Sequence, residues 1–252
     1  MCANNYEDNF ALFYNEELTE LSENMADFYI SYFQKYEMPN KNVLDIMCGP
    51  GILINKFKEN NWIAHGLDKS STMVEIAKKN NLGSKDNIYN IDINDLSYTN
   101  EFSLITCTAD GLNHINSLDA LKSIFKKVNT SLVDGGYFAF DINTILGIIN
   151  NDFYVSTDDN DTLIIRNGLT DTENNIGYTK FKGFFNYENN YLKFETVIHN
   201  YMYKIESIKQ LLEITGFNNI KIYDATDNLN IHSDISNPEN CERVVIISQK
   251  GK

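Results

Sequence analysis

The stretch Val43-Leu-Asp-Ile-Met-Cys-Gly-Pro-Gly51 decides the fold, because a short apolar run leads through a glycine-containing turn directly into a helical pattern. The apolar run predicts a strand that is buried on both faces. Glycines after such a strand let the main chain approach a ligand closely, and the N-terminus of the next helix offers unpaired amide groups. Ligands of parallel sheets bind beyond the carboxyl ends of the strands, near the point where the strand order reverses. We therefore expect Gly49 and Gly51 to lie at a ligand site.

The spacing of these glycines separates the turn from the common phosphate-binding loops. The turn is not the G-x-G-x-x-G of dinucleotide sites, and it lacks the Gly-Lys-Ser/Thr of a P-loop. The expected ligand therefore does not need to carry a pyrophosphate, and an NAD(P)-dependent reductase is disfavoured.

Short apolar runs alternate with helical patterns on both sides of the turn. The predicted strands are 43–47, 62–67, 87–91, 102–108 and 136–142, and the predicted helices are 18–36, 52–59, 71–80 and 118–132. A last helix, 205–215, ends at Gly216 and precedes strands 219–223 and 243–248, which we expect to close the same sheet. Strands that alternate with helices require right-handed crossovers. The predicted fold class is therefore α/β, with a doubly wound, seven-stranded and mostly parallel sheet.

Between residues 153 and 203 the helical spacing gives way to apolar residues that alternate with polar ones. Segments 162–165, 176–187 and 191–203 have the period of two that predicts antiparallel strands, with a turn at Asn189-Asn190. These segments form a small antiparallel β insert. We expect four regions: an N-terminal helical cap (1–40), a ligand-binding core (41–150), the insert (151–203), which covers the substrate or mediates oligomer contacts, and a C-terminal helix with the last two strands (204–252).

The composition excludes several classes of function. The 252 residues include 35 acidic and 21 basic ones, and the formal charge of -14 repels phosphate backbones and anionic lipid. Nucleic acid and membrane partners are therefore not expected. The four cysteines lie far apart without CxxC or Cys/His spacing, so we predict neither a metal site nor a disulfide framework. Because no signal-peptide pattern or apolar run of the ~20 residues of a membrane span occurs, we expect a cytoplasmic location.

Two acidic residues follow strands at the expected ligand site. Asp68 ends the second predicted strand, and Asp92 ends the third. A carboxylate at the end of the second strand can accept hydrogen bonds from both hydroxyls of a ribose. Together with Gly49 and Gly51, these acids suit a nucleoside ligand without a phosphate.

These segments resemble class I S-adenosylmethionine-dependent methyltransferases in order and spacing. Val43–Gly51 is similar to the first motif of that family, with Asp45 at its acidic position, and Leu67–Met73 is similar to the acidic second motif. Asp92-Ile93 matches the pair that meets the adenine ring. Further similar segments are 102–115, 132–141 and 203–217. The resemblance implies a Rossmann-like methyltransferase fold, with S-adenosyl-L-methionine as cofactor and S-adenosyl-L-homocysteine as product.

The resemblance also implies which residues contact the cofactor. They are Asp45, Cys48, Gly49, Gly51, Asp68, Lys69, Met73, Asp92 and Ile93. Asp68 would bind the ribose and Met73 would pack on the adenine, although a methionine one turn into a helix also suits core packing. For Asp45 we expect hydrogen bonds to loop amides, and a contact with the methionyl amine stays open. Ser70 or Ser71 is the expected N-cap of the following helix.

The insert and the segment Phe13-Tyr14-Asn15 resemble the small-molecule branch of the family, including amino-sugar and glycine N-methyltransferase-like enzymes. In that branch Tyr-Asp is usual where this chain has Tyr14-Asn15. The implied acceptor is a small molecule, with N-methylation favoured over O-methylation. Tyr14, Asp110 and His114 are the candidates for orienting or deprotonating the acceptor, although a lone histidine is more often structural.

The chemistry implied by the resemblance makes modest demands on the protein. A methyl group on a sulfonium has a good leaving group, so the protein mainly aligns the reactants. The chain has no Ser/His/Asp or Cys/His pattern, which agrees with a reaction that forms no covalent enzyme intermediate. The alternative is a non-catalytic protein that binds S-adenosylmethionine or S-adenosylhomocysteine. A monomer and a homodimer are both compatible with the sequence.

Overall fold

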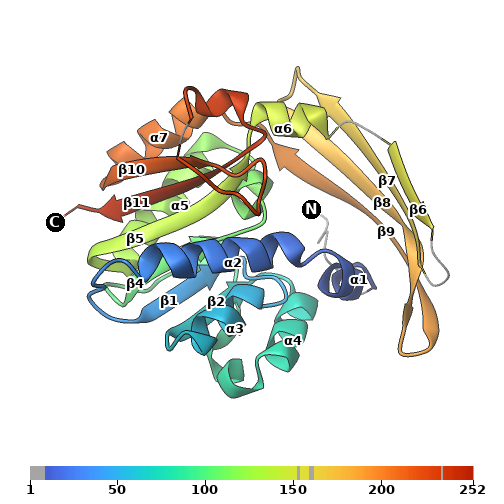
Figure 1. Cartoon of the computed structure of the whole chain (residues 1–252), viewed down its shortest axis with the longest axis horizontal. Helices are drawn as coiled ribbons and strands as arrows, with labels where there is room; N and C mark the ends of the chain where they lie inside the picture. Colours follow the sequence, from blue (N-terminus) through green and yellow to red (C-terminus); the bar gives the residue numbers. More distant parts are fainter. Residues whose placement is uncertain (1–8, 152–153, 159–161, 234, 252) are drawn as a thin grey trace.

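A seven-stranded sheet forms the core of the molecule (Figure 1). The computed structural model describes residues 9–151, 154–158, 162–233 and 235–251. The strands of the core sheet are β1 (Asn42–Ile46), β2 (Ile63–Asp68), β3 (Ile88–Asn90), β4 (Phe102–Cys107), β5 (Leu132–Asn143), β10 (Phe217–Asp224) and β11 (Arg243–Lys250). They lie in the order β10-β11-β5-β4-β1-β2-β3, and β11 runs antiparallel to both of its neighbours. The strand order reverses between β1 and β4, which places the turn after β1 where ligands of such sheets bind.

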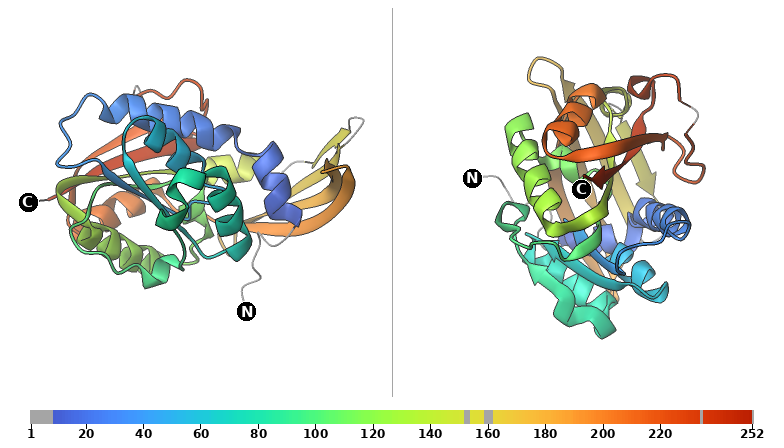
Figure 2. Two further views of the ribbon diagram at one scale, coloured as in Figure 1. Left: turned by 90° about the horizontal axis from the view of Figure 1, so that it is seen from below. Right: turned by 90° about the vertical axis from the view of Figure 1, so that its left-hand side faces the viewer.

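Helices cover both faces of this sheet, as the two views of Figure 2 show. On one face lie α2 (Glu20–Phe33), α3 (Ile52–Glu59) and α4 (Ser71–Asn80), and on the other lie α5 (Leu118–Ser131) and α7 (Ile205–Ile214). Short 3-10 helices are η1 (Leu82–Asn87), η2 (Ile93–Asp95), η3 (Gly111–His114) and η4 (Pro238–Asn240). Along β1, Val43 packs with the first group of helices and Leu44 with the second. Both faces are therefore apolar, which is why the central strands are continuous apolar runs.

The predicted α/β sheet, its two closing strands and the antiparallel insert are confirmed. Helices α3 and α4 begin and end at the predicted residues. The hydroxyl of Ser70 caps α4 by accepting a hydrogen bond from the amide of Met73 at 3.3 Å. After α7, Gly216 has a φ of 96°, which explains the glycine at that helix end.

The N-terminal region differs from the prediction of one helix over 18–36. Two helices occur, α1 (Asn9–Glu17) and α2, and α2 ends at Phe33. A further short helix, α6 (Ile145–Asn150), follows β5 and was not predicted. Its hydroxyl cap is Thr144, which accepts a hydrogen bond from the amide of Gly147 at 3.1 Å. Six residues are too few to produce a clear helical period in a sequence.

The insert is a four-stranded antiparallel sheet that stands apart from the core sheet (Figure 1). Its strands are β6 (Tyr154–Asp158), β7 (Thr162–Asp171), β8 (Ile176–Tyr187) and β9 (Asn190–Tyr201), in that order. The predicted turn at Asn189-Asn190 is wrong by one residue. Tyr187 pairs with Asn190, and the two residues between them, Glu188 and Asn189, have φ of 50° and 64°. Two positive φ values are typical of the type I′ turn, whose twist suits a hairpin.

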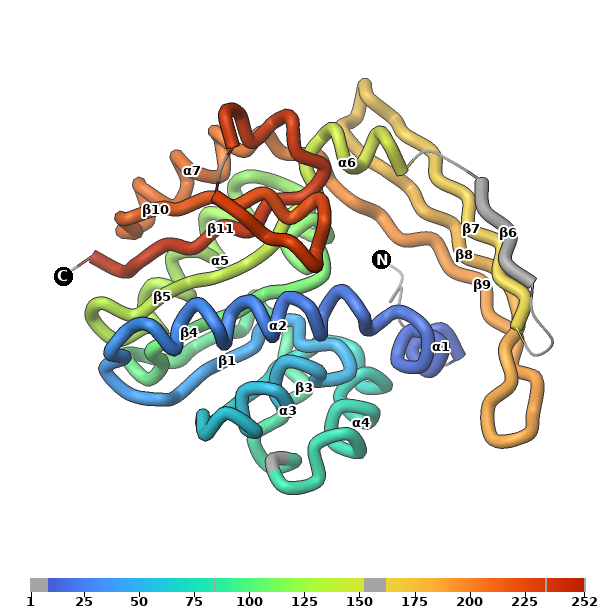
Figure 3. Tube along the Cα trace, in the orientation of Figure 1, coloured from blue at the N-terminus to red at the C-terminus, as the bar shows by residue number. Residues whose placement is uncertain are grey.

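Helix α1 joins the insert to the core, as the tube in Figure 3 shows. Phe10 and Phe13 pack with three aromatic side chains of the insert, and the rings of Phe13 and Phe194 stack at 4.4 Å. The side-chain amide of Asn9 donates to the carbonyl of Lys193 on β9 at 2.8 Å. None of the described helices is long and apolar enough to pass through a membrane. Helix α1 and strand β9 together enclose a space beyond the carboxyl ends of the core strands.

Candidate functional site

The turn between β1 and α3 exposes main chain at the carboxyl end of the sheet. Gly49 and Gly51 have φ of 50° and 78°, in the left-handed region that favours glycine. A Cβ atom on Gly49 would meet no atom within 4 Å, and Gly49 lines a cavity. A Cβ atom on Gly51 would lie 2.7 Å from Nδ2 of Asn81. Gly49 therefore leaves its main chain open to a ligand, whereas Gly51 allows close packing against the end of α4.

Asp68, the last residue of β2, holds this turn in place. Its Oδ2 accepts a hydrogen bond from the amide of Gly49 at 2.9 Å, and its Oδ1 accepts one from the amide of Ser70 at 2.8 Å. Burial raises the pKa of Asp68, and the two amides and the charge of Lys69 oppose that rise. A carboxylate has about four acceptor positions, so about two remain for the hydroxyls of a ligand.

A cavity of about 1120 Å³ extends from this turn across the ends of the strands. Asp68, Lys69, Met73, Asp92 and Ile93 line it on the core side. Met73 is 2% exposed and also packs with a small apolar cluster, so its two predicted roles are compatible. Oδ1 of Asp92 caps η2 by accepting a hydrogen bond from the amide of Asn94 at 2.8 Å. The wall thus combines two carboxylates with two apolar side chains, as a nucleoside requires.

Two features of this cavity were not predicted from the sequence. The hydroxyl of Thr108, after β4, is buried and has no hydrogen-bond partner among the described residues, and Thr108 lines the cavity. A bound ligand that reached this hydroxyl would remove the cost of leaving it unpaired. The opposite wall comes from β9, where residues 193–197, His199 and Tyr201 line the cavity. Nothing in the alternating pattern of β9 indicates which element its faces meet.

Asp45, Cys48 and Gly51 are not among the described residues that line this cavity. The prediction that Asp45 bonds loop amides is wrong. Its Oδ1 accepts a hydrogen bond from the hydroxyl of Thr106 at 2.8 Å, because the two residues are register partners on the adjacent strands β1 and β4. The amide of Gly49 in the turn donates its hydrogen bond to Asp68 instead. Cys48 is buried in the apolar cluster beneath α3, and burial raises the pKa of its thiol.

We expect Asp45 to make stability depend on pH. Burial, with the charges of Asp68 and Asp141, raises the pKa of Asp45 to about 7 against the single bond from Thr106. A folded-state pKa above the unfolded value means that stability falls as pH rises from about 4 to about 7, by up to about 4 kcal/mol. In Asp45→Asn this fall is smaller, as measured by urea unfolding at pH 4.5 and 7.5. Equal pH dependence in the two proteins would contradict the burial argument.

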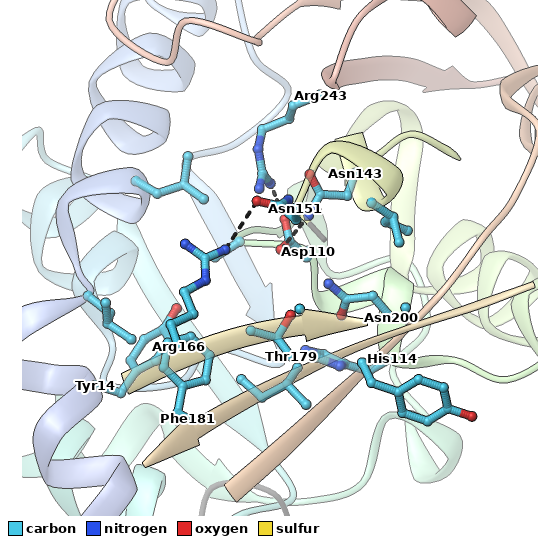
Figure 4. Close-up of a pocket in the computed structure, with 18 of the residues that line it drawn as sticks. Tyr14, Asp110, His114, Asn143, Asn151, Arg166, Thr179, Phe181, Asn200 and Arg243 are labelled. Atoms are coloured by element: carbon cyan, nitrogen blue, oxygen red, sulfur yellow. Dashed lines mark hydrogen bonds and ion pairs between the residues drawn. The ribbon is translucent and has the colours of Figure 1, made fainter. Parts of the chain in front are cut away.

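A second cavity, of about 500 Å³, lies between α1, the end of β5 and the insert (Figure 4). Its polar lining includes Asp110, Asn143, Arg166, Asn200 and Arg243, together with two acidic residues, Glu17 of α1 and Glu20 of α2. Arg166 lies on β7, donates to Oδ1 of Asn151 at 3.2 Å and stacks over the ring of Phe181 at 5.7 Å. This volume suits a small molecule rather than a macromolecular chain.

The two cavities share three residues, Tyr14, Ala109 and His114. Nδ1 of His114 lies 3.1 Å from the carbonyl of His199, and because a carbonyl only accepts, Nδ1 carries the proton and Nε2 is the acceptor nitrogen. Burial lowers the pKa of His114, so the ring is neutral at pH 7. Burial and the charge of Asp110 raise the pKa of Tyr14, so its hydroxyl stays protonated. The structure therefore brings a hydroxyl and a neutral imidazole to the junction.

Asp110, the third predicted catalytic residue, lines the second cavity next to this junction. It follows Ala109 in a turn where both residues have positive φ, 56° and 61°. Its carboxylate forms an ion pair with Arg243 and accepts a hydrogen bond from Nδ2 of Asn143 at 2.9 Å. Arg243 was missed by sequence reasoning, because it lies in the last strand, 133 residues away along the chain.

Residues 43–136 match the family model described as a methyltransferase domain. A provisionally named methyltransferase of Geobacillus sp. (strain WCH70) is 23% identical over 144 residues, which are 54% of this chain. The chain spans 57% of the length of that relative.

Solved structures match over nearly the whole chain. A S-adenosylmethionine-dependent methyltransferase from Clostridium acetobutylicum is 24% identical, with a TM-score of 0.82, over 96% of this chain and 98% of its own. CalS10, an amino pentose methyltransferase of Micromonospora echinaspora with S-adenosylmethionine bound, is 12% identical, with a TM-score of 0.73, over 97% and 98% of the two chains. At these identities the likeness establishes the fold, including the antiparallel insert as part of the matched length.

Proposed function

We propose that this chain transfers a methyl group from S-adenosylmethionine to a small-molecule amine, because residues 43–136 match the model of a methyltransferase domain and the fold is similar to that of a S-adenosylmethionine-dependent methyltransferase. The observation that carries the proposal is the pair of cavities, about 1120 and 500 Å³, that meet at Tyr14, Ala109 and His114. A transferase needs two sites that open onto one point, where the reacting groups align.

The residues of the larger cavity fit S-adenosylmethionine. We assign Asp68 to the ribose hydroxyls, Met73 and Ile93 to the faces of the adenine, and Asp92 to its edge. The exposed main chain of Gly49 and the unpaired hydroxyl of Thr108 suit the amino acid part. Lys69 lines the same wall, and Asp45, Cys48 and Gly51 act through the shape of the turn. When bound, this cofactor supplies an electrophilic methyl on a sulfonium whose thioether leaves readily.

The smaller cavity is the proposed acceptor site, with the insert as its outer wall. Tyr14 donates a hydrogen bond to the acceptor, Asp110 attracts it, and Nε2 of His114 takes the proton that an amine must lose. N-methylation is favoured over O-methylation because a carboxylate and a neutral imidazole suit an amine, whereas the described lining offers no stronger base for a hydroxyl. The amino pentose named as the substrate of CalS10 agrees with an amine acceptor.

The experiment is methyl transfer from radiolabelled S-adenosylmethionine to matched panels of small amines and their hydroxyl analogues. We expect labelled product with amines and at most weak labelling of the hydroxyl analogues. Cofactor binding by calorimetry without transfer to any acceptor would favour the non-catalytic binding protein. A cytoplasmic location and a monomeric or homodimeric state complete the proposal, and they are tested by fractionation and by light scattering.

A further inference from the structure

The strand-end turn that carries Asp110 is held by a buried carboxylate outside both cavities. Asp141 on β5 is fully buried, and its Oδ1 accepts a hydrogen bond from the amide of Ala109 at 2.7 Å. Its Oδ2 accepts one from the amide of Asp110 at 3.2 Å. Ala109 and Asp110 are consecutive non-glycine residues with positive φ, and this backbone conformation is strained. Such a turn persists only where neighbouring groups stabilise it. Asp141 supplies that hold through both amides.

Arg243 connects this buried carboxylate to Asp110. Its Nη1 is ion-paired with Oδ1 of Asp110 and with Oδ2 of Asp141. The side chain of Asp110 is 21% exposed, whereas that of Asp141 is 0% exposed. One guanidinium shared by two carboxylates leaves a net charge of about −1 on the cluster, and the exposed part of that charge lies on Asp110. Figure 4 shows Arg243 and Asp110 together above the second cavity.

The contacts of Asp141 favour its ionised form. Burial raises the pKa of Asp141, and Arg243 and the amide of Asp110 oppose this rise. Each group that bonds it, two amides and a guanidinium, is a donor, and none of the three could accept the hydrogen of a protonated carboxyl. The three donors therefore favour the ionised form of Asp141.

We propose that Asp141 and Arg243 are positioning residues that hold the Asp110 carboxylate toward the acceptor cavity with an unbalanced negative charge, so that this cavity recognises the ammonium group of its acceptor. The inference rests on the proposed function and specifies that one end of the acceptor carries an ammonium group. Arg166 is a cation on another strand of the same cavity and interacts electrostatically with Asp110, and Glu17 and Glu20 also line the cavity, so its lining holds more acidic than basic side chains. Ala109, next to Asp110, borders both cavities, so the same charge acts at the position of the reacting methyl.

The test uses two cofactor analogues, so it does not depend on knowing the acceptor. S-adenosylhomocysteine is neutral at the sulfur, and sinefungin carries an amino group where the cofactor carries its methyl. We expect the native chain to bind sinefungin about tenfold more tightly than S-adenosylhomocysteine at pH 7 in calorimetry. In Asp141→Asn, Arg243 is balanced by Asp110 alone, and this ratio falls at least about fivefold while S-adenosylhomocysteine affinity is retained.

Control variants separate charge from general damage. Asp134→Asn makes the same chemical change at a residue that is 77% exposed, near the start of β5 at the other end of the sheet, and leaves the ratio unchanged. Arg243→Lys keeps the charge and retains most of the ratio. Asp110→Asn removes the carboxylate that lines the cavity, and this variant tests the inference if Asp141→Asn does not fold.

Two results would overturn the inference. One is equal affinity of the native chain for the two analogues, and the other is an unchanged ratio in both Asp141→Asn and Asp110→Asn. Failure of the native chain to bind either analogue would instead overturn the proposed function, and this inference with it. The two failures are therefore distinguishable in one set of titrations.

Discussion

Asp68→Ala is expected to weaken binding of S-adenosylhomocysteine at least tenfold. The carboxylate has two proposed tasks, which are to bond the ribose hydroxyls and to hold the amides of Gly49 and Ser70 in the turn. Each charge-assisted hydrogen bond contributes about 1.5 to 3 kcal/mol, so loss of a single bond to the ribose accounts for about tenfold to about 150-fold. Isothermal titration calorimetry at pH 7.5 measures the change directly.

Two further variants assign the loss to the ribose contact. Asp134→Ala removes an exposed carboxylate elsewhere and should leave affinity unchanged. Asp68→Asn keeps one acceptor oxygen for the amide of Ser70 and lacks the acceptor that faces Gly49. We expect its affinity to lie between those of Asp68→Ala and the native chain. Unchanged affinity in Asp68→Ala would count against the ribose assignment.

Gly51→Ala is expected to destabilise the protein by about 3 kcal/mol, or roughly 5 to 10 °C in melting temperature. At a φ of 78° a side chain is strained, and the new Cβ would lie 2.7 Å from Nδ2 of Asn81 and 3.0 Å from Cβ of Ala77. Asn81 is 1% exposed and is held by bonds to the carbonyls of Gly51 and Ala77, so it cannot move aside cheaply. Thermal unfolding followed by circular dichroism gives the shift.

Gly49→Ala is the matched control, because its φ of 50° carries a similar strain without any clash within 4 Å. Its stability loss should be about 1 kcal/mol. Because Gly49 borders the cofactor cavity, its main effect should be on S-adenosylhomocysteine affinity. Equal losses of melting temperature in the two variants would show that the packing at Gly51 is not what requires a glycine.

The core of the fold follows from local sequence, because its signals are short-range. The helices 52–59 and 71–80 match the prediction to the residue. Helical spacing marks both of them, and the cap at Ser70 marks the start of the second. Helix α1 was missed because its apolar residues, Phe10 and Phe13, pack on strands about 170 residues away. The hairpin turn was misplaced by one residue because asparagine occupies both 189 and 190, and only the strand register separates the two possibilities.

The residues of the site also fall into two groups, those with a short-range sequence signal and those that depend on contacts distant in the sequence. Gly49, Asp68, Met73, Asp92 and Ile93 were found from motif spacing, and the structure brings them to one cavity. The wall from β9 depends on how the insert lies against the core, which the period of two does not encode. The cluster of Asp141 and Arg243 joins strands 102 residues apart along the chain, and each residue alone is an ordinary polar position in an apolar strand.

The most direct test of the account is a crystal structure of the native chain with S-adenosylhomocysteine. We expect the adenosyl group in the larger cavity, with the ribose hydroxyls on Asp68 and the sulfur facing Tyr14 and His114 at the junction. The acceptor cavity should stay open beside the sulfur. A sulfur directed away from the junction, or an adenosyl group bound elsewhere, would contradict it.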